Sequence, residues 1–232
     1  MNSFVDIRHP ARIYQTEPLP AWTYLNAELL ELEYERVILP SWQFVCHQNQ
    51  VKEAGDKLSE DELIGMINLL LIAGYETTVN LIGNGALALI ENPVQRELFK
   101  YDPGTAIEEL LRYTSPLDIA SQRFAAEEMT IDSTTIQRGD IVVAMIGSAN
   151  HDETQFHDPD TLDLTRDPNR HVAFGQGIHF CIGAPLARLE GQIALLTLFR
   201  RFPNVRLDRK PESLRWRKSL IVRGLEELHV LA

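Results

Sequence analysis

The stretch that says most about the chemistry of this 232-residue chain lies near its C-terminal end: Phe174-Gly175-Gln176-Gly177-Ile178-His179-Phe180-Cys181-Ile182-Gly183. These residues place a cysteine among glycines, just before an apolar segment that we expect to be helical from Pro185 to Phe199. The free N–H groups at the start of a helix carry a partial positive charge, which favours the thiolate form of cysteine that binds metals. The glycines leave room for a flat ligand beside the sulfur. The stretch therefore predicts a thiolate metal ligand at Cys181.

Two simpler interpretations of this stretch exist. A lone cysteine in apolar surroundings is often a small core residue, and a glycine-rich turn before a helix can bind phosphate. The spacing favours neither, because the stretch resembles the haem-ligand loop of the cytochrome P-450 family. The matching positions are Phe174, Gly175, Gly177, His179, Cys181 and Gly183, followed by Ala187-Arg188. The resemblance implies that Cys181 binds the iron of haem b (iron protoporphyrin IX).

A second stretch similar to the same family, Ala73-Gly74-Tyr75-Glu76-Thr77-Thr78, lies inside a long helical pattern that Pro93 ends. The run from Leu63 to Ala73 is apolar nearly all round, which predicts a central, buried helix. This run is shorter than the roughly twenty apolar residues of a membrane span. Capping-box spacings predict helix starts at the pairs Ser59–Glu62 and Thr105–Glu108.

The resemblance gives the second stretch a catalytic role. Ala73 and Gly74 would leave a flat patch for haem or dioxygen, and Glu76 and Thr77 would relay protons for dioxygen activation. Without the resemblance, Ala-Gly in a helix indicates close helix packing, and Thr77 would hydrogen-bond its own helix.

A third stretch, Glu109-Leu110-Leu111-Arg112, places a carboxylate and a guanidinium three residues apart on one helix face. Such a pair is usually exposed to solvent. The resemblance implies instead a buried charge network of Glu109, Arg112 and a later arginine, which holds the ligand loop in place. Arg166 has the usual position of this third member, and Arg170 is a neighbouring alternative.

The segment between these motifs predicts short strands from isolated apolar residues among polar ones. These residues are Ile131, Ile136, Ile141, Val143 and Met145. The expected fold class is mainly α with small β-sheets, the C-terminal half of the cytochrome P-450 fold. Its parts would be a long central helix, the ExxR helix, short sheets, the Cys-ligand loop and the helix that follows.

Further haem and substrate contacts follow from the resemblance. Arg123 and His179 correspond to partners of the haem propionates, and we favour Arg123 because carboxylates bind forked cationic donors well. Either residue is otherwise a surface charge. Residues 115–119 and 219–222 correspond to segments that line the family's substrate pocket.

Residues 1–54 resemble a different family, the N-terminal lead-in of Rieske non-haem iron oxygenase large subunits. The resemblance rests on the segments 19–24, 31–33 and 41–47. Cys46 and His47 are adjacent, whereas a Rieske cluster needs two separated Cys/His pairs, so we predict no Rieske cluster. The sequence thus predicts two domains, 1–54 and a truncated haem-binding region at 55–232.

Composition indicates the cellular setting. The chain has 33 acidic and 22 basic side chains and a formal net charge of −11, which disfavours nucleic acid and anionic membranes as partners. Two cysteines without framework spacing favour a reducing compartment, and the polar N-terminus has no apolar signal region. We therefore expect a cytoplasmic location.

Three functional hypotheses remain. The first is a monooxygenase that takes electrons from a ferredoxin or flavin reductase type of donor and hydroxylates an apolar small molecule. The second is a truncated haem-binding remnant without turnover, and the third is a remnant without any cofactor. Family members are about twice the length of this chain, so we expect the long helix and the haem face to expose apolar surface unless residues 1–54 or a second chain cover them, and we expect a tendency to self-associate.

Overall fold

Helices dominate residues 58–231, the part of the chain that this computed structural model describes. They are α5 (Glu60–Glu91), α6 (Pro93–Phe99), α7 (Pro103–Thr114), α8 (Ile146–Ala149) and α9 (Ala184–Arg201), with short 3-10 turns η3 (Gly177–His179) and η4 (Pro211–Ser213). The predicted fold class, mainly α with small sheets, is confirmed.

The strands in the described residues form three antiparallel two-stranded sheets. β1 (Arg123–Phe124) pairs with β4 (Ile141–Val142), β2 (Met129–Ile131) with β3 (Thr134–Ile136), and β5 (Arg206–Leu207) with β6 (Val230–Leu231). The predicted strand residues Ile131, Ile136 and Ile141 lie in these strands. Val143 and Met145 do not, because the chain leaves β4 after Val142 and Met145 becomes the N-cap of α8.

Proline and capping residues set the helix ends. α5 is 32 residues long and ends at Glu91, since Pro93 starts α6. α7 begins at Pro103, and the Asp102 side chain accepts a hydrogen bond from the Thr105 N–H at 3.0 Å. The predicted Thr105–Glu108 capping box is therefore wrong, because Asp102 caps the helix three residues earlier than expected.

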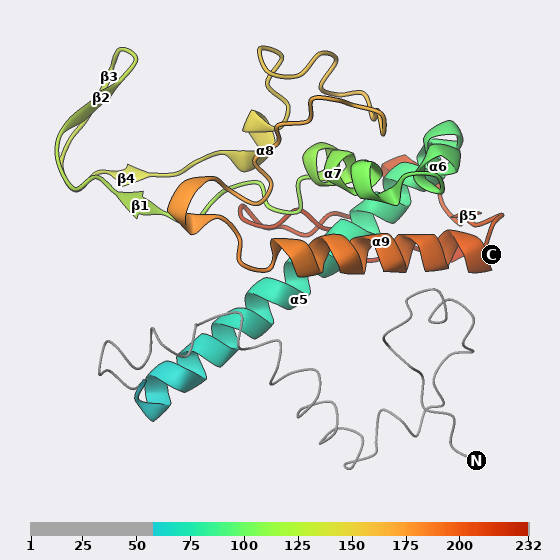
Figure 1. The fold of residues 1–232 in the computed structure, drawn as a ribbon, viewed down its shortest axis with the longest axis horizontal. Coiled ribbons are helices and arrows are strands. Elements are labelled where there is room, and N and C mark those ends of the chain that lie inside the picture. The colour runs from blue at the N-terminus through green and yellow to red at the C-terminus, as the bar shows by residue number, and fades with distance from the viewer. Residues whose placement is uncertain (1–57, 232) are drawn as a thin grey trace. The chain divides into compact units, whose positions relative to one another are not determined.

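The apolar core lies where α7 and α9 pack against the C-terminal half of α5 (Figure 1). Gly191 of α9 permits this close approach, because a Cβ there would lie 2.8 Å from Ile107 Cδ1 and 3.1 Å from Leu81 Cδ2. Fully buried residues at the centre of the core include Leu81, Leu89, Phe99, Ile107, Leu110 and Leu195.

The N-terminal half of α5 differs sharply from its C-terminal half. Its large apolar side chains are exposed, with Leu69 at 65%, Ile72 at 67% and Tyr75 at 75%, and Figure 1 shows this half extending beyond α7 and α9. The expectation of a buried run from Leu63 to Ala73 is therefore wrong for the described structure, where burial begins at Asn80. The apolar pattern predicted the helix but not the packing partner that would bury it.

The exposed apolar surface expected on the long helix is present. By length and hydropathy alone α5 would also suit a membrane span, a test that the core helices of soluble proteins pass as well.

Candidate functional site

The predicted ligand loop, residues 174–183, is a tight turn before α9. The Cys181 N–H donates to Phe174 O at 2.9 Å and closes the loop. Gly175 and Gly177 have φ values of +74° and +75°, in the left-handed region where a side chain would be strained. Their backbone freedom lets the chain turn back so that Cys181 stands directly before the helix.

The surroundings of Cys181 suit an apolar ligand. The thiol is exposed, free of a disulfide, and flanked by the exposed side chains of Ile178, Phe180 and Ile182. Gly183 is the N-cap of α9, and a Cβ there would lie 3.9 Å from Cys181 Sγ. The positive end of the α9 dipole thus lies next to the cysteine, where it favours a negative sulfur.

The donor set can be tested against haem. Residues 58–231 contain no group of three or more His, Cys, Asp or Glu side chains that could hold a bare metal ion. Cys181 therefore suits a metal that brings its other ligands with it, as iron does in a porphyrin. The residues of the loop fit haem in this respect.

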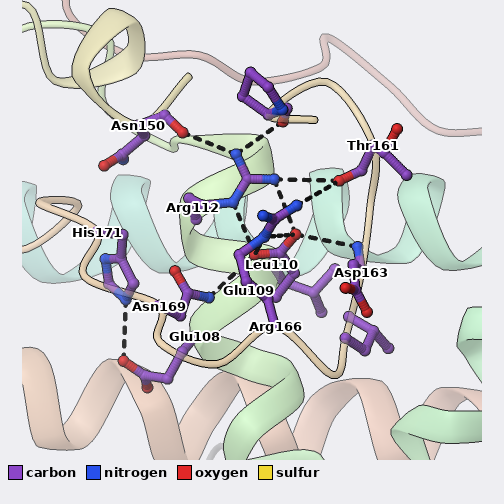
Figure 2. Close-up of polar contacts among 12 residues, drawn as sticks. Glu108, Glu109, Leu110, Arg112, Asn150, Thr161, Asp163, Arg166, Asn169 and His171 are labelled. Carbon is purple, nitrogen blue, oxygen red and sulfur yellow. Dashed lines mark hydrogen bonds and ion pairs between the residues drawn. The ribbon is translucent and has the colours of Figure 1, made fainter. Parts of the chain in front are cut away.

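A buried charge network joins α7 to the loop that follows α8 (Figure 2). Arg112 donates to both carboxylate oxygens of Glu109, from Nε to Oε2 at 2.7 Å and from Nη2 to Oε1 at 2.9 Å. Arg166 Nε lies 3.2 Å from each of the same oxygens, and Asn169 Nδ2 donates to Oε2 at 3.0 Å. Glu109 and Arg112 are both completely buried. The structure thus brings together the three residues of the predicted network, with Arg166 and not Arg170 as the third member.

The network fixes the loop between α8 and the ligand loop. Arg112 Nη1 donates to the carbonyl oxygens of Asn150 and Pro159, both at 2.8 Å. Asn150 is fully buried, and its Oδ1 accepts from the Val172 N–H at 2.8 Å. Val172 lies two residues before the ligand loop, so Asn150 connects the network to that loop. Sequence reasoning missed this role of Asn150.

A second cluster, also missed from the sequence, lies beside the ligand loop. Glu108, next to Glu109 on α7, contacts Arg188 of α9 and His171. Burial raises the pKa of the Glu108 carboxyl, but hydrogen bonds from His171 and Arg188 outweigh this and lower the pKa to about 2. The Ala187-Arg188 motif pointed to Arg188, but nothing in the sequence pointed to its partner.

The predicted proton-relay residues lie on the exposed half of α5. Thr77 Oγ1 donates to Ala73 O at 2.6 Å, so the hydroxyl bonds its own helix. Glu76 Oε1 accepts from Arg217 Nη1 at 3.0 Å. A Cβ on Gly74 would meet no atom within 4 Å, so the backbone is open there. Both the helix-bonding interpretation of Thr77 and an open patch at Ala73–Gly74 agree with this geometry.

The two predicted propionate partners are both exposed. Arg123 lies in β1, and its Nη1 donates to Ser121 Oγ at 2.7 Å. His179 ends η3 in the ligand loop. The two predicted pocket segments, by contrast, lie side by side: Asp118 N donates to Ile221 O at 2.9 Å, and Arg223 N donates to Pro116 O at 3.0 Å.

Predictions for residues 1–54, including the Rieske-like segment, Cys46 and His47, fall outside the described residues.

Several known proteins are similar to this chain in sequence. A family profile described as Cytochrome P450 matches residues 105–226. The polyketide biosynthesis cytochrome P450 PksS of Bacillus subtilis is 44% identical over 232 residues, which cover 99% of this chain and 56% of PksS. Cytochrome P450 107B1 of Saccharopolyspora erythraea is 52% identical, over 77% of this chain and 45% of that protein. The chain thus spans about half the length of these curated relatives.

Solved structures give the same result for the fold. The structure of PksS matches with a TM-score of 0.72 at 42% identity, covering 92% of this chain and 58% of that one. The tirandamycin C-bound monooxygenase TamI matches with a TM-score of 0.74 at 44% identity, covering 89% of this chain and 52% of that one. The sequence match to PksS extends through nearly all of residues 1–54. The Rieske-like origin of that segment stays a prediction, and the match to PksS offers a competing explanation.

Proposed function

Because the chain belongs to the cytochrome P450 family, we propose that it forms the haem-thiolate part of a monooxygenase, an oxidoreductase in which the Cys181 thiolate would bind the iron of haem b. The observation that supports this most is the exposed Cys181 thiol, held by a closed glycine turn at the positive end of α9. When bound, the haem would supply dioxygen activation, which a thiolate ligand favours by donating electron density.

The remaining loop residues would hold the macrocycle. Gly175, Gly177 and Gly183 carry no side chain that would crowd a ligand beside the sulfur, and Phe174 anchors the turn through its carbonyl oxygen. Arg123 and His179 would bind the propionates, since both are exposed and can donate to carboxylates. Ala73 and Gly74 would leave a patch free of bulky side chains for haem or dioxygen.

Glu76 and Thr77 would manage protons. While the Thr77 hydroxyl donates to Ala73 O, its oxygen can still accept a hydrogen bond from a bound molecule. The Glu76–Arg217 ion pair is partly exposed, with the Glu76 side chain at 36% and the Arg217 side chain at 40%, so it is weak and can open. In this proposal, Glu76 Oε1 would exchange protons with solvent, and the Thr77 hydroxyl would pass them to the bound molecule.

The partners follow from this chemistry. An apolar small molecule would be the substrate, and a ferredoxin or flavin reductase type of protein would supply the electrons. The names of PksS and of the TamI structure make polyketide-derived compounds and tirandamycin C the first compounds to screen. We propose a cytoplasmic location and self-association through the exposed half of α5.

One observation favours a second candidate, haem binding without turnover. The half of α5 that carries Glu76 and Thr77 exposes its apolar side chains in the described structure. Dioxygen activation needs a site from which water is excluded. The ligand loop lies outside this half of α5, so haem can bind to Cys181 where turnover fails.

A carbon monoxide spectrum tests the proposal. The full chain is reconstituted with haem, reduced and exposed to carbon monoxide, beside Cys181→Ala and a matched control, Cys46→Ala, which changes the chain's other cysteine. We expect a strongly red-shifted Soret band in the parent and in the control, and its loss in Cys181→Ala. A parent without this band would overturn the haem-thiolate proposal.

Turnover with a surrogate reductase then separates the two candidates. Product formation supports the monooxygenase, and binding without product supports the second candidate. In an active protein Thr77→Ala should raise hydrogen peroxide release per electron pair, while the neighbouring Thr78→Ala should not. Equal peroxide release in both variants would contradict the proton role of Thr77.

A further inference from the structure

Helix α7 presents two adjacent carboxylates that bind different parts of the chain. Glu109 bonds Arg112, Arg166, Asn169 and the Asp163 N–H. Glu108 bonds Arg188 and His171 instead (the His171 contact is drawn in Figure 2). Successive helix residues point about 100° apart, so one helix can hold two loops with neighbouring residues. The two carboxylates therefore have separate tasks.

The Glu108 cluster has well-defined hydrogen-bond geometry. Arg188 donates from Nε to Glu108 Oε1 at 2.6 Å and from Nη2 to Oε2 at 2.8 Å, a bidentate pair. His171 Nδ1 accepts from the Ala173 N–H at 3.2 Å, so Nε2 is the ring nitrogen that carries a hydrogen. That Nε2–H donates to Glu108 Oε2 at 3.0 Å. Glu108 thus fixes His171, which precedes the ligand loop in the sequence, and Arg188, which follows it.

The cluster reaches the ligand loop through Phe174. The Arg188 guanidinium lies over the Phe174 ring, 4.6 Å from its centroid, a cation–π contact. The His171 ring lies 6.3 Å from the same ring. Phe174 O in turn accepts the hydrogen bond of the Cys181 N–H. A continuous series of contacts therefore leads from Glu108 through Arg188 and Phe174 to Cys181.

Arg188 also acts on Cys181 through its charge. The pKa of the Arg188 guanidinium is raised, first by its hydrogen bond to Glu108 and in smaller part by the Cys181 thiolate. Glu108 accepts the two hydrogen bonds that hold the Arg188 guanidinium over the Phe174 ring.

We propose that Glu108 is a positioning residue for the haem-ligand loop: through Arg188 and His171 it fixes Phe174, and through Phe174 it fixes the backbone that presents Cys181. The inference rests on the proposed function, because it assumes that the loop exists to hold haem. Glu109 holds the preceding loop, residues 150–169, and does not replace Glu108 in this role.

Amide hydrogen exchange of the cofactor-free chain tests this without haem. In Glu108→Gln, which keeps the size and removes the charge, we expect exchange of the Cys181 amide to rise about tenfold, while amides of residues 150–169 stay unchanged. Glu108→Asp keeps the charge but shortens the reach, so it should show a smaller rise. Glu97→Gln, which removes a carboxylate from the exposed Glu97–Lys100 pair, is the matched control and should change nothing in the loop.

Arg188→Lys provides an independent variant, because lysine keeps the charge but loses the fork and the stacking on Phe174. If Glu108 acts through Arg188, the double variant Glu108→Gln/Arg188→Lys should raise exchange no more than the larger single effect. If Glu108→Gln does not fold, Arg188→Lys and Glu108→Asp carry the same test.

The outcomes separate this inference from the proposed function. Unchanged Cys181 exchange in Glu108→Gln, or a rise of equal size throughout residues 150–169, would overturn the positioning role, even where the parent gives the red-shifted band. If the parent lacks the band, the haem proposal is overturned. The hydrogen-exchange measurement then still decides whether Glu108 positions the loop. Where haem binds, Glu108→Gln should also reduce the fraction of the red-shifted Soret band, which a residue with a role only in folding elsewhere would not move.

Discussion

The charge network and the ligand loop lie close together in the fold. The polar groups of the network are paired within the protein, whereas the side chains of the loop face solvent. In the network, Glu109 and Arg112 are completely buried and every described partner is a protein group. In the ligand loop, Cys181 and its apolar neighbours turn outward and are exposed. The same contrast divides α5, whose C-terminal half is packed and whose N-terminal half is exposed.

This difference separates the residues that stabilise the fold from those that are available to a ligand. Changes on the packed side should unfold the protein, because buried charges that lose a partner are very unfavourable. Changes on the exposed side should alter binding and leave the fold intact. Four measurements of stability distinguish the packed side from the exposed side.

The largest effect is expected for Arg112→Ala. It removes both bidentate contacts to Glu109 and the bonds to Asn150 O and Pro159 O. Breaking such a buried pair should lower the free energy of unfolding by about 3–5 kcal/mol. Urea denaturation of the cofactor-free chain measures this, with Glu97→Gln as an exposed control that leaves the curve unchanged. A loss below about 1 kcal/mol would contradict the scaffold role of the network.

The next effect is a pH dependence from Glu108. The folded pKa of about 2 lies below the ordinary value of 4.5, so ionised Glu108 adds stability above pH 4.5 that is lost as the pH falls toward 2. The side chain is 28% exposed, so we expect this contribution to be on the order of 2 kcal/mol at pH 7. Urea unfolding at a series of pH values should show the gap between the parent and Glu108→Gln closing between these limits. A constant gap would contradict the ion pair.

Two glycine substitutions should change the free energy of unfolding in opposite directions. A Cβ on Gly224 would collide with the buried Asn80 amide on the packed half of α5, so Gly224→Ala should destabilise by about 1–3 kcal/mol. A Cβ on Gly65, on the exposed half, would meet no atom within 4 Å. Gly65→Ala should therefore stabilise by about 0.5–1 kcal/mol through helix propensity. Thermal unfolding checks both, and effects of the same sign would refute the division of α5.

The smallest effect is expected for Cys181→Ala in the cofactor-free chain. Because the thiol is exposed, its removal should change the free energy of unfolding by no more than about 0.5 kcal/mol. Urea denaturation gives this value directly. A loss comparable to that of Arg112→Ala would mean that Cys181 belongs to the packed scaffold and not to a ligand site.

Much of the fold could be predicted from local signals. Pro93 predicted the end of α5, and the apolar pattern after Cys181 predicted α9. The three residues of the charge network followed from the family's spacing, and the structure brings them together.

The rest depends on contacts that the sequence does not display. The burial of α5 depends on which partner covers each half, and helical periodicity says nothing about partners. The Glu108–Arg188 pair joins residues 80 positions apart, so no local pattern contains it. Glu108 also matched a capping box with Thr105, and the competing cap, Asp102, has an equally common capping side chain.

The central claim is the bond between Cys181 sulfur and haem iron, and X-ray absorption at the iron edge of the reconstituted chain tests it most directly. We predict a sulfur neighbour of the iron in the parent and in Cys46→Ala, and none in Cys181→Ala. An iron surrounded only by nitrogen and oxygen in the parent would contradict the account.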